Sequence, residues 1–118
     1  MTTAPATPKT PVNPEAAALG TWFHNLHLPD GTQTCPDHWL GDFPAFKWRE
    51  VEASIPGDLN GWSCLDIGCN AGFYSFELAK RGATVLGIDL DERYLRQAAW
   101  AAKQYGFEDR VRFERMQV

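Results

Sequence analysis

The fold is decided by the stretch Cys64-Leu65-Asp66-Ile67-Gly68-Cys69-Asn70-Ala71-Gly72-Phe73, followed by Gly87-Ile88-Asp89-Leu90-Asp91. The apolar residues that end at Ile67 predict a strand, and the glycines after them predict a loop whose backbone can approach a ligand closely. A helical segment and a second strand follow, and that strand ends at the acidic Asp89. This order predicts a strand-loop-helix-strand unit that binds a nucleotide-like ligand at its loop.

The spacing of the acid and the composition of the loop separate two classes of cofactor. Asp89 lies 21 positions after Gly68, close to the separation of about 20 expected when one helix joins the strands and the acid binds ribose hydroxyls. The dinucleotide pattern G-x-G-x-x-G needs glycine where this chain has Asn70 and Phe73. Those glycines admit a pyrophosphate and allow close helix packing, so the sequence disfavours NAD or FAD. An NAD-binding oxidoreductase is therefore the less favoured function.

The loop resembles motif I of the class I S-adenosylmethionine-dependent methyltransferases, in which an acid precedes G-x-x-x-G. Asp66, Gly68 and Gly72 match this motif, whereas Asn70 replaces its usual middle glycine. Asn tolerates left-handed backbone geometry better than most residues. The resemblance implies S-adenosyl-L-methionine as cofactor, with Asp66 near its methionine moiety and Asp89 accepting hydrogen bonds from its ribose hydroxyls.

Length and composition are those of a single domain without a membrane segment. The chain has 118 residues, of which 44% are hydrophobic, and no stretch is apolar enough to span a bilayer. Its three cysteines, two of them at the strand and loop, favour reduced thiols, so we expect a cytoplasmic protein. The net charge of −4 gives no general basic field for a phosphate backbone, so tRNA is allowed as a partner but not indicated.

The sequence divides into three zones. Residues 1–13 are rich in Thr, Ala and Pro and predict a disordered tail. Residues 14–60 predict a small segment of helix, hairpin and helix before the main domain. A short helix begins at Pro14, and the turn Pro29-Asp30-Gly31 predicts a hairpin. For residues 61–118 the resemblance implies the N-terminal half of an S-adenosylmethionine-binding methyltransferase domain.

Alternation and helical spacing predict which side chains of residues 14–60 are buried. If residues 22–28 are extended, one face of the hairpin carries Trp22, His24, Leu26 and Leu28. A second helix begins at Asp42 and has apolar residues at helical spacing, so it should lie on the main domain. We expect Phe46 and Trp48 of this helix to be part of the core.

Residues 61–118 predict β-α-β-α-β. The expected elements are a strand from near Trp62, a helix from Gly72, a strand from Ala83 to Leu90, a helix from Asp91 to Gly106 and a strand from Val111 to Val118. The expected buried stripes are Phe73, Phe76 and Ala79 in the first helix and Leu95, Ala98, Ala99 and Ala102 in the second. The right-handed crossover rule orders the parallel strands 3-2-1. The fold class is α/β, a truncated half of the Rossmann-like methyltransferase fold.

The resemblance also implies that four strands and their helices would follow in a complete domain. The first strand would then be central, and here one of its edges is left without a partner. We expect the sequence to be a fragment of a longer protein. A second copy in a homo-oligomer, or another chain that covers the open edge, is the alternative.

Residues 20 to 118 are similar to one branch of the superfamily, on the segments Trp22-Phe23-His24-Asn25-Leu26-His27-Leu28-Pro29-Asp30-Gly31, Phe46-Lys47-Trp48 and the motif I loop. This branch is related to the tRNA wobble-uridine carboxymethyltransferases, which use carboxy-S-adenosyl-L-methionine. The resemblance places Lys47 where their lysine holds the extra carboxylate, but Asp42 stands where they carry a tryptophan. An acid would repel that carboxylate, so we favour ordinary S-adenosyl-L-methionine.

The expected function is S-adenosylmethionine-dependent methyl transfer to an unidentified small molecule or tRNA base, with this chain carrying the cofactor-binding half. A non-catalytic half-domain scaffold is the alternative. No catalytic base is assigned, and His24 and His27 are the candidates for that role. Zinc is not expected, because the spacing of His24, His27, Cys35 and His38 matches no common zinc pattern. The expected cofactor-binding residues are Asp66, Gly68, Cys69, Asn70, Gly72, Phe73, Asp89, Leu90 and Lys47.

Overall fold

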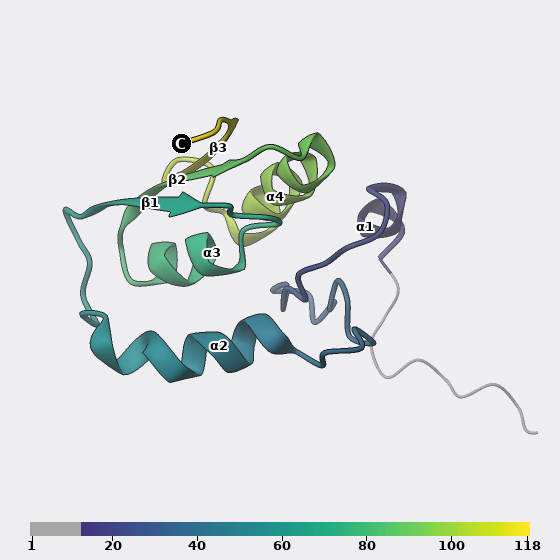
Figure 1. Ribbon diagram of the computed structural model, residues 1–118, viewed down its shortest axis with the longest axis horizontal. Coiled ribbons are helices and arrows are strands. Elements are labelled where there is room, and N and C mark those ends of the chain that lie inside the picture. The colour runs from purple at the N-terminus through teal and green to yellow at the C-terminus, as the bar shows by residue number, and fades with distance from the viewer. Residues whose placement is uncertain (1–12) are drawn as a thin grey trace, which may run out of the picture.

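The computed structural model describes residues 13–118. The disordered tail expected at residues 1–13 therefore lies outside the described residues, except for Asn13. The elements, in chain order, are α1 (Pro14–Ala18), α2 (Phe43–Val51), the 3-10 helix η1 (Glu52–Ser54), β1 (Ser63–Ile67), α3 (Phe73–Lys80), β2 (Thr84–Asp89), α4 (Glu92–Tyr105) and β3 (Val111–Arg115). Figure 1 shows the sheet above α3, with α2 on the far side of α3.

The three strands form one parallel sheet in the order β1-β2-β3, which confirms the predicted α/β fold and strand order. In register, Cys64 pairs with Val85 and Val85 with Val111. Helix α3 contacts β1 and β2, and α4 contacts β2 and β3. Both helices therefore cover the sheet face that carries Val85 and Val111, as two right-handed crossovers in one direction require.

The opposite face of the sheet is open near β1. Leu65 and Ile67 point to that face, and their exposed fractions are 55% and 60%. Because side chains alternate along a strand, the neighbouring Cys64 and Asp66 point toward the helices and are half-buried. Every helix within residues 13–118 is too short or too polar to cross a membrane.

The hairpin expected after residue 21 is reduced to a single antiparallel bridge between His27 and Gln33. Side chains take the place of further strand pairing: the Leu26 amide donates to Thr34 Oγ1 at 2.8 Å and the Cys35 amide to Asn25 Oδ1 at 2.9 Å. The predicted alternation is confirmed, because one face is buried through Trp22, His24, Leu26 and Leu28.

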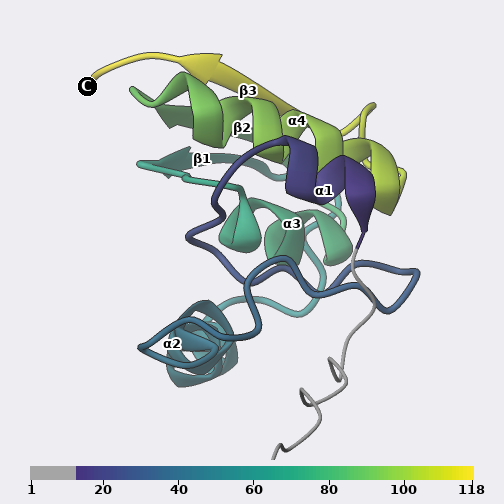
Figure 2. The same ribbon diagram turned by 90° about the vertical axis from the view of Figure 1, so that its right-hand side faces the viewer.

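Helix α2 packs on α3 through a narrower face than its sequence suggests. Pro44 and Trp48 are buried, as helical spacing requires. Phe46 lies two positions from each of them, on the opposite side of the helix, and is 57% exposed. The expectation that Phe46 is a core residue was therefore wrong, whereas that for Trp48 is confirmed. Figure 2 shows α2 again separated from the sheet by α3.

The buried stripe of α4 is rotated relative to the prediction. Ala98 and Ala102 are buried as expected, but Ala99 is exposed and Leu95 is only half-buried. Gln97 and Ala101 are buried instead. The cause is the segment after α1, which covers this side of α4: Gln97 Nε2 donates to the carbonyl oxygens of Leu19 and Thr21 at 3.1 and 3.0 Å. A contact between distant segments thus decides which face of α4 is buried.

We expect Gly87→Ala to lower the free energy of unfolding by about 1–3 kcal/mol, the usual cost of overpacking a core. A Cβ on Gly87 would lie 2.6 and 2.7 Å from Cδ1 and Cε1 of Phe113 and 3.1 Å from Cys69 Cβ. Urea unfolding measures the change. Gly57→Ala is the control, because a Cβ there meets no atom within 4 Å. Equal loss of stability in both variants would contradict the packing role of Gly87.

Candidate functional site

The glycine loop between β1 and α3 is held in an unusual backbone conformation. Gly68, Asn70 and Gly72 have φ angles of 69°, 52° and 94°. All three lie in the left-handed region, which costs glycine little and asparagine less than most residues. Asn70 Oδ1 accepts a hydrogen bond from the Ala71 amide at 2.7 Å. The asparagine thus adopts the left-handed geometry that the loop needs at its middle position.

Close packing beneath the loop explains its second glycine. A Cβ on Gly72 would lie 2.9 Å from Phe113 Cζ and 3.0 Å from Phe76 Cε2. The Cys69 amide donates to the Ile88 carbonyl at 2.9 Å, and the Gly72 amide donates to the Cys69 carbonyl at the same distance. The loop therefore lies directly on the carboxyl ends of β1 and β2, where parallel sheets bind ligands.

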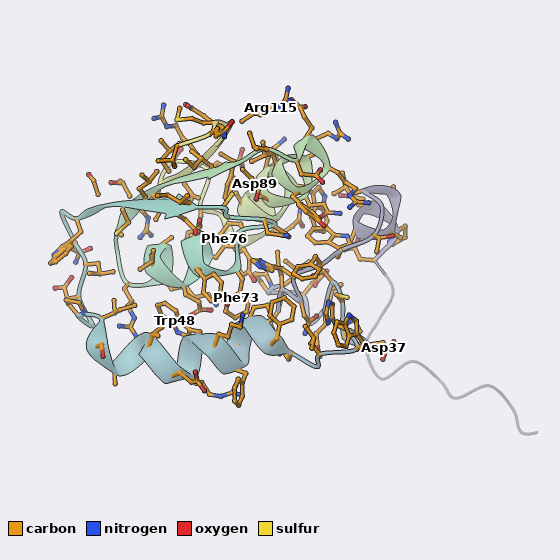
Figure 3. All side chains as sticks on the ribbon, viewed as in Figure 1. Asp37, Trp48, Phe73, Phe76, Asp89 and Arg115 are labelled. Carbon is orange, nitrogen blue, oxygen red and sulfur yellow. The ribbon has the colours of Figure 1, made fainter. Side chains whose placement is uncertain are left out.

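Asp89 ends β2 with its carboxylate fixed beside the loop (Figure 3). Its Oδ2 accepts from the Asn70 amide and its Oδ1 from the Asp91 amide, each at 2.9 Å. A carboxylate oxygen can accept a second hydrogen bond. Asp89 is thus held in one orientation by two backbone amides and can still accept from the hydroxyls of a ligand.

Asp66 lies on the neighbouring strand β1, and its carboxylate is oriented by Ser75, a residue that the sequence did not single out. Its Oδ2 accepts from Ser75 Oγ at 2.7 Å. Burial raises the pKa of the Asp66 carboxyl, the Ser75 hydrogen bonds lower it, and the Asp89 charge raises it further. Ser75 is fully buried in α3. The sequence does contain a signal for this pair: Ser75 lies on the buried side of the helix, nine residues after Asp66. Because a buried hydroxyl needs a hydrogen-bond partner, an acid at the nearby strand end is a natural one.

An open cavity of about 360 Å³ brings three of the expected residues together. Its lining residues are Ile67, Gly68, Asp89, Leu90, Met116, Gln117 and Val118. Leu90 and Met116 are 55% and 45% exposed, so they offer apolar surface next to a carboxylate. This combination suits a nucleoside, whose base is apolar on its faces and whose sugar carries hydroxyls.

Two expected site residues have their side chains in the core. Cys69 is fully buried, and desolvation, followed by the Asp66 and Asp89 charges, raises the pKa of its thiol to about 12. Phe73 is 6% exposed, and in Figure 3 it lies between α3 and α2. The side chains of these two residues therefore support the loop from the core.

His24 reaches the loop from the segment before α2. It is 5% exposed, and its Nδ1 accepts from the Phe73 amide at 3.3 Å. Burial lowers the pKa of His24 to about 4; the Asp89 charge raises it and the Lys47 charge lowers it. Lys47 lies on α2, with its Nζ 5.6 Å from the centre of the Phe43 ring. The charges of Asp89, at the end of β2, and of Lys47, on α2, thus both act on the buried His24.

His27 lies apart from the loop. Its Nε2 pairs with Asp42 Oδ2 at 2.5 Å, and its carbonyl accepts from the Tyr105 hydroxyl at 2.8 Å. Tyr105 ends α4, whereas Asp89 precedes the start of that helix. The structure thus brings only one of the two histidine candidates to the loop. Within residues 13–118, no group of three or more His, Cys, Asp or Glu side chains is arranged to hold a metal ion.

Comparisons with known proteins agree with this geometry. Residues 64–118 match the family model described as a methyltransferase domain. A ubiquinone biosynthesis O-methyltransferase from Leptothrix cholodnii is 46% identical over 56 residues, which cover 48% of this chain and 23% of the relative. A tRNA U34 carboxymethyltransferase from Desulfotalea psychrophila is 48% identical over 44 residues, covering 36% of this chain and 13% of the relative. The matches thus span less than a quarter of these curated relatives.

Among solved structures, an S-adenosylmethionine-dependent methyltransferase from Mesorhizobium loti has a TM-score of 0.51 and 29% sequence identity. The match covers 60% of this chain and 31% of that protein. Residues 64–118 thus match a methyltransferase domain, and the chain has part of the Rossmann-like fold found in S-adenosylmethionine-dependent methyltransferases.

Proposed function

We propose that the protein binds S-adenosyl-L-methionine at the loop of residues 68–72 and transfers its methyl group to an acceptor. The observation that carries this proposal is the Asp89 carboxylate, held by the amides of Asn70 and Asp91 at the mouth of the loop. The similarity to S-adenosylmethionine-dependent methyltransferases supports it. In this proposal Asp89 accepts hydrogen bonds from the ribose hydroxyls, and Leu90 packs against the base.

The electrostatics of the site favour this cofactor over a dinucleotide. The charge of Asp89 raises the pKa of Asp66, so the two carboxyl groups lie close enough to interact. A pair of acids suits a ligand with an ammonium group and hydroxyls, and it repels a pyrophosphate. We therefore place the methionine end of the cofactor near Asp66 and disfavour NAD.

The remaining expected residues take different parts. Gly68, Asn70 and Gly72 supply the left-handed backbone of the loop. Cys69 and Phe73 contribute backbone atoms and support from the core. Lys47 stays a candidate for a contact from α2, because its charge acts on His24 beside the loop. We favour ordinary S-adenosyl-L-methionine over the carboxylated form, since Asp42 places a negative charge at the start of α2, the helix that carries Lys47.

The bound cofactor supplies an electrophilic methyl group on a sulfonium. The residues of this chain contribute positioning, which can account for several kcal/mol of the barrier of a two-substrate reaction. Neither histidine is assigned as a base. The Nδ1 lone pair of His24 already accepts from Phe73, and His27 is paired with Asp42 away from the loop.

The proposal includes two classes of methyl acceptor. One relative is named for ubiquinone biosynthesis and another for tRNA U34, so a small molecule and a tRNA base are the two classes to test. Radiolabelled methyl transfer into the small-molecule and tRNA fractions of a cell extract separates them. Label in the small-molecule fraction alone would exclude the tRNA base, and label in tRNA alone would exclude the small molecule.

Titration calorimetry of the full-length protein with S-adenosylhomocysteine and with NAD tests the cofactor. We expect binding of S-adenosylhomocysteine and no measurable heat with NAD. The same titration of residues 1–118 asks whether this part of the domain binds alone. Absence of S-adenosylhomocysteine binding by the full-length protein would refute the proposal, and binding without methyl transfer to either fraction would favour a scaffold.

A further inference from the structure

We propose that His24 is a positioning residue of the cofactor site. It accepts a hydrogen bond from the first amide of α3 and thereby holds the glycine loop in place, although it lies outside the matched domain. The family match begins at residue 64, whereas His24 lies 49 positions before the amide that it accepts from. This inference rests on the proposed cofactor site. It adds to this site the segment around residue 24, which lies outside the matched domain.

The need for such a residue follows from the start of α3. The first amides of a helix have no partner within the helix and are usually satisfied by a side chain at the N-cap. The N-cap of α3 is Gly72, which has no side chain and makes no cap hydrogen bond. His24 Nδ1 supplies the missing acceptor to the Phe73 amide at 3.3 Å. Because both residues are buried, loss of this acceptor would leave the amide unsatisfied.

The His24 ring is itself held in one orientation. It makes steep edge contacts with the rings of Phe43, Phe73 and Tyr74, at centroid distances of 5.9, 6.4 and 5.8 Å. The His24 carbonyl accepts from Thr34 Oγ1 at 2.8 Å. A side chain whose orientation is held by three neighbouring rings can hold its hydrogen-bond partner in place, whereas a mobile side chain cannot.

This contact is continuous with the cofactor loop. Phe73 directly follows Gly72, and the Asn70 amide, three residues before Phe73, donates to Asp89 at 2.9 Å. A displacement of the helix start would therefore shift the amide that orients the ribose-binding carboxylate. The Asp89 charge acts on His24, which agrees with the short path between them.

The same hydrogen bond argues against His24 as a general base. A neutral imidazole has one nitrogen that accepts and one that carries the proton. Nδ1 accepts from Phe73, so Nε2 is the protonated nitrogen and has no lone pair to receive another proton. The histidine therefore positions the loop and takes no proton from the acceptor.

Three variants of the full-length protein test the role of His24. His24→Phe fills the space without an acceptor, whereas His24→Asn places Oδ1 where Nδ1 lies. His27→Asn is the matched control, because it changes a histidine of the same segment that pairs with Asp42 instead. We expect the dissociation constant for S-adenosylhomocysteine to rise about 10-fold in His24→Phe and to stay within about 3-fold of wild type in the other two.

The outcomes separate this inference from the proposed function. Wild-type protein that fails to bind S-adenosylhomocysteine refutes the proposed function. If a folded His24→Phe variant binds S-adenosylhomocysteine as tightly as wild type, the positioning role is refuted. Equal weakening of binding in His24→Asn and His24→Phe also refutes it. If His24→Phe does not fold, nitrogen-15 NMR of the wild-type histidines decides: a protonated Nε2 and an unprotonated Nδ1 on His24 support the role, and the opposite tautomer overturns it.

Discussion

Replacement of Asp89 by asparagine is expected to weaken binding of S-adenosylhomocysteine by about 10- to 100-fold. Hydrogen bonds to a charged group contribute about 1.5–3 kcal/mol, and the substitution removes the charge. Asparagine also has a single acceptor oxygen, while the aspartate accepts from both Asn70 and Asp91 through different oxygens. The amide group of the variant therefore faces one of these donors, which disturbs the loop as well as the ligand. Calorimetric titration measures the loss.

Asp91→Asn is the matched control for this measurement. It removes the same charge two residues away, and its side chain accepts from the Arg93 amide at the start of α4. Asparagine caps a helix about as well as aspartate, so both folding and cofactor binding should stay near wild type. If the two variants bind equally well, the specific role of the Asp89 carboxylate is wrong.

A second large effect is expected in the pH dependence of stability. The pKa of His24 is about 4 in the folded protein and 6.5 in the unfolded chain. The unfolded chain therefore binds the proton more tightly, and the free energy of unfolding decreases as the pH falls from 6.5 toward 4. The full contribution is about 3 kcal/mol, present above pH 6.5 and lost by pH 4. The cause is burial, which disfavours the charged ring.

The difference between wild type and His24→Asn isolates this contribution. Urea unfolding at pH 7 and at pH 4.5 gives the change for each protein, and all titratable groups other than His24 are the same in both. Asp66, whose pKa is raised, shifts both proteins in the same way. Wild type should lose about 2–3 kcal/mol more than the variant over this range. Parallel losses would mean that His24 is not buried as a neutral ring.

The motif around Gly68 could be predicted because every step depends on neighbours in the sequence. The strand, the loop, the helix and Asp89 follow one another, so their order and spacing define the β-α-β unit and its strand order. Asn70 is an instructive case, since its tolerance of left-handed geometry was sufficient to predict that it replaces glycine. Its φ of 52° agrees.

The errors and omissions arise where distant segments meet. Ala99 was expected in the core, but the segment after α1 covers Gln97 instead. Phe46 was expected to be buried, but the buried side of α2 carries Pro44 and Trp48, and Phe46 lies on the other side. The hydrogen bond from Phe73 to His24 joins residues 49 positions apart. Local periodicity contains no information about which element will cover a helix or cap its first amide.

Burial of Cys69 has a consequence for a protein that handles an alkylating cofactor. The sulfonium methyl group is an electrophile, and a thiolate in the same loop would be a competing nucleophile. Burial, with the Asp66 and Asp89 charges, raises the pKa of this thiol to about 12, so it stays protonated and out of reach. In the proposed function, burial above all, together with the charges of Asp66 and Asp89, would keep this thiol from reacting with the bound methyl donor.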